Sequence, residues 1–214
     1  MKQRRDVYHH GDLRNALVAS AVRLIETGGP AAFSLRAAAR EVGVSANAAY
    51  RHFDDKSALM AAVAAEGFAR LATRMRRSMA GSPLRRAAEP EPIARFKAVG
   101  RAYVGFAADH PEMFRVMFGE DGAAYRFGEP SAPWMLLAQS LDALVVGGFL
   151  TPERRPGAEM KAWVVVHGLA CLTLEGLGLA PTRRGRAAAL ESLLQFTVIG
   201  LCGEIRGAVQ SHSM

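Results

Sequence analysis

Apolar residues recur every three or four positions along most of this chain, which is the spacing of an amphipathic α-helix. The first such run includes Leu13, Leu17 and Leu24, and it ends where Gly28–Pro30 interrupts the pattern. No stretch alternates apolar and polar residues convincingly, so no β-strand is predicted. The pattern therefore predicts an all-α protein.

The segment from Phe33 to Leu59 predicts two short helices joined by a glycine-containing turn. Ser34 can cap the first helix, Gly43 can take the left-handed conformation that ends it, and Ser45 can cap the second. This layout is a helix-turn-helix. The second helix is expected to carry Asn47, Tyr50, Arg51 and His52 but few large apolar residues, so its exposed face is free to enter a DNA major groove.

A long helix follows, for which Asp54 or Asp55 can provide the N-cap, and its apolar residues recur at intervals of four as far as Met79. Glycine, serine and proline at residues 81–83 end it. We expect an N-terminal arm and three-helix helix-turn-helix domain over residues 1–55, a linking helix over 56–80 and a larger helical domain over 81–214. Within the larger domain, helices are predicted over 93–110, 111–118, 132–148, 157–179 and 183–210, with a loop over 119–133.

Charge is unevenly distributed along the 214 residues, whose net charge is +7. The first 80 residues hold 13 Lys and Arg against 7 Asp and Glu, and so carry most of the excess. A basic segment on a near-neutral remainder is typical of a nucleic-acid-binding module, although charge alone would fit a membrane surface or simple solubility equally well.

The motif Val42-Gly-Val-Ser-x-x-x-x-Tyr50-x-His52-Phe53-x-x-Lys56 resembles the signature of TetR-type transcriptional repressors. The segments Tyr8–Arg14 and Trp163–Gly168 further resemble a subgroup whose C-terminal domain carries a Trp, His, Gly signature. This resemblance implies a regulator that binds a palindromic DNA operator as a homodimer and is released by a small apolar effector.

The second helix departs from the common pattern of that family, because it has Asn47 and Ala49 where many members have glycine and an aliphatic residue. Asparagine can donate to and accept from one adenine, and small alanines can contact thymine methyl groups. By the resemblance, Tyr50, His52 and Lys56 reach backbone phosphates, although Lys56 could be a solvated lysine and Tyr50 could pack partly on the first helix. The expected DNA contacts are Ser34, Arg36, Ser45, Ala46, Asn47, Ala48, Tyr50, Arg51, His52 and Lys56.

Lys2, Arg4 and Arg5 form a basic arm that could reach a minor groove or stay disordered in solvent without DNA. His9 and His10 are poorly placed to chelate a metal, because they are adjacent and no Cys or carboxylate cluster completes a site. No metal is therefore expected.

Most aromatic and methionine residues of the larger domain fall in four predicted helices. An ordinary core accounts for any single one of them, whereas the resemblance implies a small-molecule pocket between these helices. Trp163 and His167 lie four apart on one helical face, so His167 is either a core histidine with a polar partner or a ligand contact. The expected ligand-binding residues are Tyr103, Phe106, Met113, Phe114, Met117, Trp134, Trp163 and His167.

The last two predicted helices interleave leucine with small residues, which permits close helix approach. The resemblance implies a four-helix dimer interface formed there by two copies, whereas a monomer would leave an apolar patch exposed. A dimer would also present two helix-turn-helix domains to the two halves of a palindrome. The expected interface residues are Leu172, Leu190, Leu194, Thr197 and Leu201.

An enzyme and a non-specific architectural DNA-binding protein are the alternatives. The chain has no GxSxG, no P-loop and no GxGxxG motif after a strand. His110 with Asp109 and His167 with Cys171 are conceivable catalytic pairs, but each lacks a third member. An architectural protein would not need a neutral, aromatic-rich second domain. We therefore expect a DNA-binding regulator with no enzymatic activity and no cofactor.

Cys171 and Cys202 stand in apolar stretches without the spacing of a zinc or redox motif, so we expect buried free thiols in a reducing compartment. Residues 1–7 are charged and no apolar segment follows them, as a secretory signal would require. The longest uncharged apolar run, Ala162–Leu174, is shorter than the roughly 20 residues of a membrane helix. We expect a soluble, cytoplasmic protein.

Overall fold

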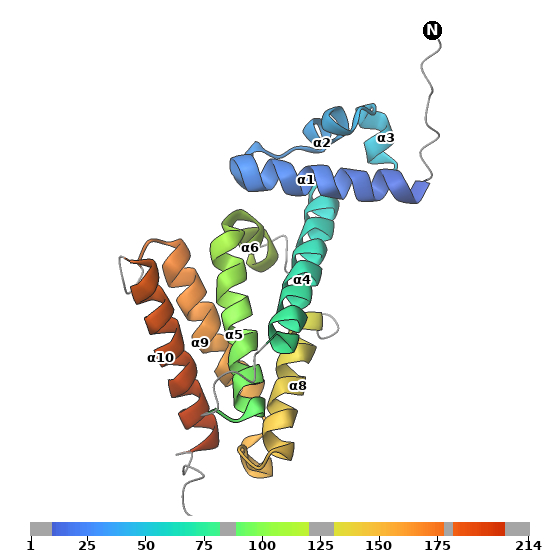
Figure 1. Cartoon of the computed structure of the whole chain (residues 1–214). Coiled ribbons are helices and arrows are strands. Elements are labelled where there is room, and N and C mark those ends of the chain that lie inside the picture. Colours follow the sequence, from blue (N-terminus) through green and yellow to red (C-terminus); the bar gives the residue numbers. More distant parts are fainter. Residues whose placement is uncertain (1–9, 82–88, 120–130, 178–181, 204–214) are drawn as a thin grey trace, which may run out of the picture. The chain divides into compact units, whose positions relative to one another are not determined.

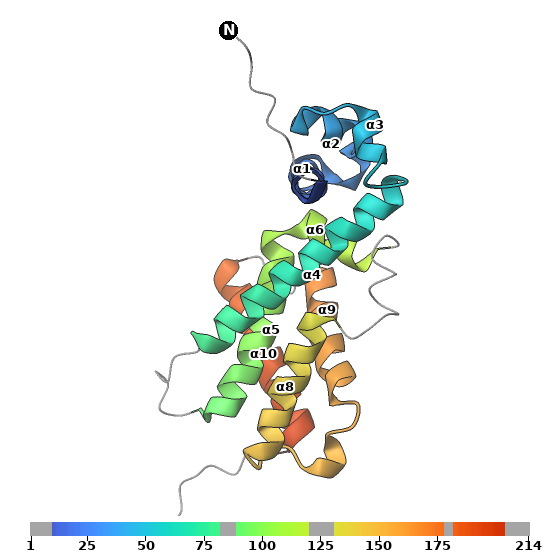
Figure 2. The same ribbon diagram turned by 90° about the vertical axis from the view of Figure 1, so that its right-hand side faces the viewer.

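The computed structural model describes residues 10–81, 89–119, 131–177 and 182–203. Within these ranges every regular element is a helix, as Figures 1 and 2 show, and the all-α prediction is confirmed. The chain divides into two compact units. The first unit comprises residues 1–70 and 109–131, and the second unit comprises residues 71–108 and 132–214.

The first unit contains α1 (His10–Ala32), α2 (Leu35–Val42), α3 (Ala46–Tyr50), the N-terminal part of α4 (Lys56–Ala80) and α6 (Pro111–Phe118). Helix α1 is interrupted at Gly29, where φ is 73°, a value that glycine adopts readily. The predicted interruption of the first helix is thus confirmed. Helix α1 packs against both α2 and α6.

Helix α6 joins the first unit because it packs closely on α1 and α4. Gly67 of α4 has no side chain, and a Cβ added there would lie 2.6 Å from Sδ of Met117. The thioether of Met117 therefore occupies the space that any larger residue at position 67 would need. The compact units place α6 with the helix-turn-helix and divide α4 after Arg70, whereas α6 falls within the larger domain predicted over 81–214.

The second unit contains the rest of α4 together with α5 (Glu91–Asp109) up to residue 108, α8 (Ala132–Val146), the short 3-10 helix η2 (Pro152–Arg154), α9 (Ala158–Leu174) and α10 (Arg183–Cys202). Helix α9 packs against α8 and α10. Gly100 of α5 allows close approach to the other helices, because a Cβ added there would lie 2.5 Å from Leu194 and 3.3 Å from Val166.

The predicted helices of the larger domain exist, but some of their ends differ. Helix α9 ends at Leu174 rather than at residue 179, because Gly176 adopts a left-handed φ of 72°. Helix α10 ends at Cys202, and Gly203 follows it at φ 82°. The predicted continuation to residue 210 lies beyond the described residues, as does most of the predicted loop over 119–133.

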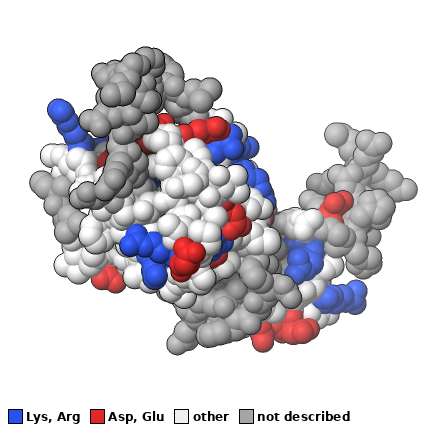
Figure 3. Space-filling model, turned by 90° about the horizontal axis from the view of Figure 1, so that it is seen from below, with Lys and Arg blue, Asp and Glu red and all other residues white. Residues whose placement is uncertain are grey.

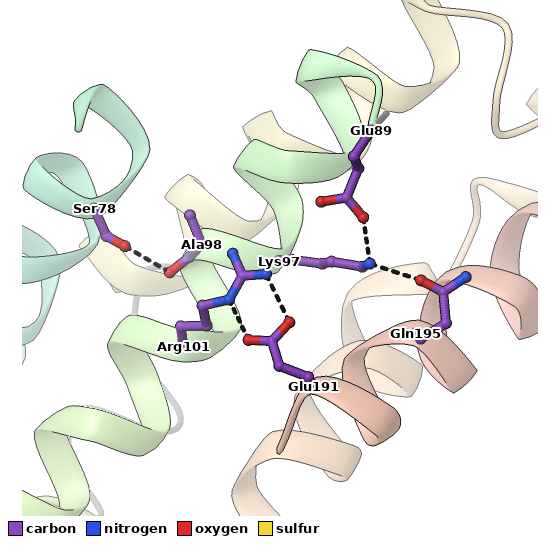
Figure 4. A network of polar contacts seen from close by, with 7 residues as sticks. All are labelled: Ser78, Glu89, Lys97, Ala98, Arg101, Glu191 and Gln195. Atoms are coloured by element: carbon purple, nitrogen blue, oxygen red, sulfur yellow. Dashed lines mark hydrogen bonds and ion pairs between the residues drawn. The ribbon is translucent and has the colours of Figure 1, made fainter. Parts of the chain in front are cut away.

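A buried lysine joins α5 to α10 in the second unit (Figure 4). The Lys97 residue is only 5% exposed, and its Nζ donates to Oε1 of Gln195 at 2.6 Å and to the carboxylate of Glu89. One turn further along α5, Arg101 forms a two-bond ion pair with Glu191. Burying a charge is costly unless it is paired, so these contacts fix how α10 lies on α5.

Candidate nucleic-acid interface

Local hydrogen bonds define the start of both helices of the helix-turn-helix. Oγ of Ser34 accepts from the backbone N–H of Ala37 at 3.1 Å, and Oγ of Ser45 accepts from that of Ala48 at 3.2 Å. Each bond satisfies one of the N–H groups that a helix leaves unpaired in its first turn. The two predicted N-caps are thus confirmed.

The turn between the two helices depends on Gly43, which adopts φ 81° and ψ 27°. Its N–H donates to the carbonyl of Arg40, and the N–H of Val44 donates to that of Ala39 at 2.9 Å. This pair of bonds is a Schellman motif, which needs a left-handed residue after the helix. The predicted left-handed end of α2 is confirmed, and it sets the direction in which α3 leaves.

A polar contact between α1 and α2 braces the helix-turn-helix and was not predicted. Oγ of the buried Ser20 donates to Oε2 of Glu41 at 3.0 Å, and Arg23 pairs with the same carboxylate at 2.7 Å. The hydrogen bond from Arg23, followed by that from Ser20, outweighs desolvation and lowers the pKa of Glu41. A serine within the apolar stripe of the first predicted helix was the available sequence signal.

The face of α3 expected to read bases is open to solvent. Asn47 is exposed, Tyr50 is 44% exposed, and Ala49 is fully buried on the opposite side. A small residue at position 49 therefore fits the packing of α3 against the first unit.

All ten predicted DNA contacts lie in the first unit. Exposed among them are Ser34, Arg36, Ser45, Asn47, Tyr50, Arg51 and Lys56, whereas Ala46, Ala48 and His52 are half-buried.

The residues Arg51 and His52 lie in the turn after α3 rather than on the helix itself. The N–H groups of His52 and Phe53 both donate to the carbonyl of Ala49, at 3.0 and 3.1 Å. The chain therefore makes a tight corner between α3 and α4, and Phe53 enters the core there. Helix α3 itself spans only Ala46–Tyr50.

Helix α4 begins at this corner with a lysine. Oδ1 of Asp55 accepts from the N–H of Ala58 at 2.7 Å, so Asp55 rather than Asp54 provides the cap. Lys56 follows, and its Nζ lies 5.8 Å from the centroid of the buried Phe33 ring, within cation–π range. A cation in the first turn opposes the helix dipole, and a phosphate nearby would remove that penalty.

A second cation covers the other phenyl ring of this region. The guanidinium carbon of Arg14 on α1 lies 4.9 Å from the centroid of the Phe53 ring. Sequence reasoning missed Arg14 as a possible contact, because nothing local connects position 14 to the corner after α3. Its exposed side chain thus lies next to the predicted phosphate contacts.

The predicted ligand-binding residues are divided between the units. Met113, Phe114 and Met117 of α6 are buried in the first unit, where they belong to its core. The structure brings together Tyr103, Trp134, Trp163 and His167 of the second unit, and Phe106 is buried in the same unit. In that group Trp163 stacks on His167, with ring centroids 4.7 Å apart, and meets Trp134 edge-on at 6.4 Å.

A chain of hydrogen bonds runs through this aromatic group. Nε1–H of Trp163 donates to the hydroxyl of Tyr103 at 3.2 Å, since indole can only donate. The hydroxyl lies 2.8 Å from Nδ1 of His167, and Nε2 lies 3.5 Å from Sγ of Cys171. If the buried hydroxyl uses its own proton for Nδ1, the histidine proton lies on Nε2. Burial lowers the pKa of His167 and raises that of Tyr103, so both are neutral at physiological pH. Both ring nitrogens of His167 thus have partners, as expected of a core histidine.

The predicted dimer residues mostly face inward. Leu194, Thr197 and Leu201 are buried within the chain itself, so these three are corrected from interface to core. Helix α10 presents Phe196, 67% exposed, and Ile199 to solvent instead. On α9, Leu172 is exposed as predicted, and Leu190 of α10 is half-buried.

The exposed apolar residues of α9 and α10 are Met160, Val164, Leu172, Phe196 and Ile199, which we call the apolar face. These residues belong to the second unit. On the side of the molecule in Figure 3, uncharged residues cover most of the described surface, and charges of either sign are interspersed among them.

Metal and membrane sites do not arise among the described residues. No group of three or more His, Cys, Asp and Glu there could hold a metal ion. Cys171 and Cys202 are free thiols, but they are half-buried rather than buried as predicted. No helix in the described ranges is long and apolar enough to cross a membrane. The basic arm and His9 precede the described residues, and the side chain of His10 is likewise outside them.

Two family models match this chain. The model described as "Bacterial regulatory proteins, tetR family" matches residues 17–63, and the model described as "Tetracyclin repressor-like, C-terminal domain" matches residues 96–197. A search of curated proteins found none that matches.

Solved structures similar to this chain cover nearly all of it. A protein of unknown function from Rhodococcus sp. RHA1 is 31% identical, with a TM-score of 0.69 over 92% of this chain and 100% of that one. A TetR variant from Acinetobacter baumannii AYE in complex with minocycline is 20% identical, with a TM-score of 0.61 over 90% and 96%. RolR in complex with resorcinol is 14% identical, with a TM-score of 0.61 over 87% and 88%.

Proposed function

The chain belongs to the TetR family of bacterial regulatory proteins, and we propose that it represses transcription by binding a palindromic operator as a homodimer, which a small apolar effector releases. The family's helix-turn-helix and the second helical domain point to a DNA-binding transcriptional regulator rather than an enzyme. The operator, the dimer and the effector are the parts that we add to this family assignment.

The observation that best supports DNA binding is the solvent-exposed face of α3, rigidly capped at its start and flanked by cations. In our proposal, Asn47 contacts an adenine edge in the major groove, where an amide can donate and accept at once. Tyr50, His52 and Lys56 contact the phosphates beside it and fix the position of α3. The net charge of the whole chain, +7, favours the approach to DNA.

The homodimer is supported by the apolar face of α9 and α10. A side chain as exposed as Phe196, next to Ile199 on one helix, is unfavourable in a soluble monomer and is typical of a protein interface. A two-fold axis through this face would pair each helix with its own copy. Such a dimer carries two copies of α3, as a palindromic operator requires.

The effector site is proposed at the aromatic group of Tyr103, Trp134, Trp163 and His167. Two similar structures hold minocycline and resorcinol, which supports a ligand role for the second unit here. Aromatic rings favour an apolar ligand. Helix α4 continues from the first unit into the second, so it offers a direct route between effector and DNA.

The test begins with selection of operator sequences from random duplexes by the full-length protein. We expect the wild-type protein to select a two-fold symmetric site. Asn47→Ala should lose the base preference at one position in each half-site, which would weaken binding to the selected operator by about 1–3 kcal/mol. Lys56→Ala should instead weaken binding to all duplexes alike. If the wild-type protein selects no sequence, the proposed function is wrong, and a non-specific architectural role becomes the better explanation.

A further inference from the structure

Arg14 occupies a place in the structure that its position in the sequence does not suggest. It lies on α1, outside the helix-turn-helix, yet its guanidinium stands 4.9 Å from the ring of Phe53, at the corner between α3 and α4. Phe53 directly follows His52, one of the proposed phosphate contacts. Arg14 therefore brings a positive charge from α1 to the edge of the proposed DNA-binding surface.

No carboxylate neutralises this guanidinium within the described part of the chain. The nearby Asp55 caps α4 through the N–H of Ala58, and Arg14 takes part in no ion pair with a described residue. A guanidinium that lies over an aromatic ring can still donate its N–H groups to an anion. Arg14 is thus held in place by an apolar partner and still available to bind.

Lys56, the first residue of α4, also lies over a phenyl ring. Its ammonium covers the buried Phe33, which precedes α2, just as Arg14 covers the buried Phe53, which follows α3. Lys56 likewise forms no ion pair with a described residue. Two cations without an ion pair to a described residue therefore lie over the two phenylalanines that precede α2 and follow α3.

We propose that Arg14 binds a phosphate of the DNA backbone, and that Arg14 and Lys56 together hold the strand against α3. This inference rests on the proposed function and adds α1 to the DNA-binding surface. Guanidinium suits phosphate because two of its N–H groups can donate to the oxygens of one phosphate. The contact positions the protein on the duplex and carries no sequence information.

The test measures how DNA affinity depends on salt for full-length Arg14 variants. Arg14→Met keeps an apolar cover over Phe53 but removes the charge, and Arg14→Lys keeps the charge but loses the planar stack. Arg183→Met, an exposed position in the second unit, is the matched control for the loss of one arginine. Affinities for the selected operator and for a random duplex are measured across a salt series, and urea unfolding confirms that each variant folds.

We expect Arg14→Met to lower the slope of log affinity against log salt by about one unit and to weaken binding roughly tenfold near 0.1 M salt, equally for both duplexes. Arg14→Lys should keep the wild-type slope, and Arg183→Met should change neither quantity. A wild-type slope in Arg14→Met would overturn this inference while the proposed function stands. Absence of any salt-dependent DNA binding by the wild-type protein would overturn both.

Discussion

Replacing Tyr103 by phenylalanine removes one oxygen atom from the middle of the hydrogen-bonded chain in the second unit. The hydroxyl accepts from Trp163 at 3.2 Å and lies 2.8 Å from Nδ1 of His167, so both partners lose a bond at once. Each bond contributes about 0.5–1.5 kcal/mol net. Because the ring itself fits the same space, we expect the free energy of unfolding to fall by about 1–3 kcal/mol.

Urea unfolding followed by circular dichroism measures this loss. Tyr50→Phe is the matched control, because the Tyr50 side chain is largely exposed and its hydroxyl has no hydrogen bond to a described residue. Surface changes of this kind shift stability by about 0.5 kcal/mol or less. Equal midpoints for Tyr103→Phe and Tyr50→Phe would refute the stabilising contribution of these two hydrogen bonds.

The protonation of His167 provides an independent readout of the same change. Burial holds its pKa below the ordinary value of about 6.5, so the folded state favours the neutral ring. As pH falls below about 6.5 the unfolded chain binds a proton first, and stability declines until the folded-state pKa is reached. Tyr103→Phe removes the hydroxyl beside Nδ1, so we expect NMR titration to show a higher His167 pKa. The pH range over which the free energy of unfolding declines should then be narrower.

Three further changes test other parts of the structure. Phe196→Glu should give a folded monomer in sizing chromatography, whereas Ser192→Glu on the same helix serves as the exposed control; an intact Phe196→Glu dimer would show that the interface lies elsewhere. Because the pKa of Glu41 is lowered in the folded state, its ionised form contributes stability that is lost as pH falls through that folded-state pKa. In Glu41→Gln we therefore expect the free energy of unfolding, measured by urea titration, to decline less at acid pH. The same decline as in the wild-type protein would contradict the pairing with Arg23. Ser45→Ala should destabilise α3 by about 1 kcal/mol and weaken DNA binding, and unaltered affinity for the operator would argue against a rigid α3.

The helix-turn-helix could be predicted in detail because its signals are local. A serine cap acts within three residues, and a left-handed glycine acts at one position, so Ser34, Gly43 and Ser45 could be assigned from sequence alone. The exception is the end of α3, where Arg51 and His52 leave the helix. The corner exists because Phe53 is drawn into the core, and that depends on contacts beyond the motif.

The faces of α10 could not be predicted, because it is apolar on more than one side. Leu194 and Leu201 face their own core, whereas Phe196 and Ile199 face outward. Helical spacing separates the two sets, but it does not say which set meets the core. The contact of Leu194 with Gly100 decides this, and those positions are far apart in sequence.

The same limit applies to contacts between distant positions in the first unit. The pairing of Arg23 with Glu41 and the stacking of Arg14 on Phe53 both join α1 to later segments. Each residue alone looks like an ordinary surface charge or core aromatic. Only the packing of α1 across the helix-turn-helix brings them together.

The edge-on pair of Trp134 and Trp163 gives the second unit a spectroscopic signal of its own. These are the only two tryptophans in the chain, and their ring centroids are 6.4 Å apart, close enough for their electronic transitions to couple. Indole emission therefore reports on the second unit alone. Because Trp163 also stacks on the neutral His167, protonation of that ring would quench the emission, so the protein carries an optical probe at the proposed effector site without any added label.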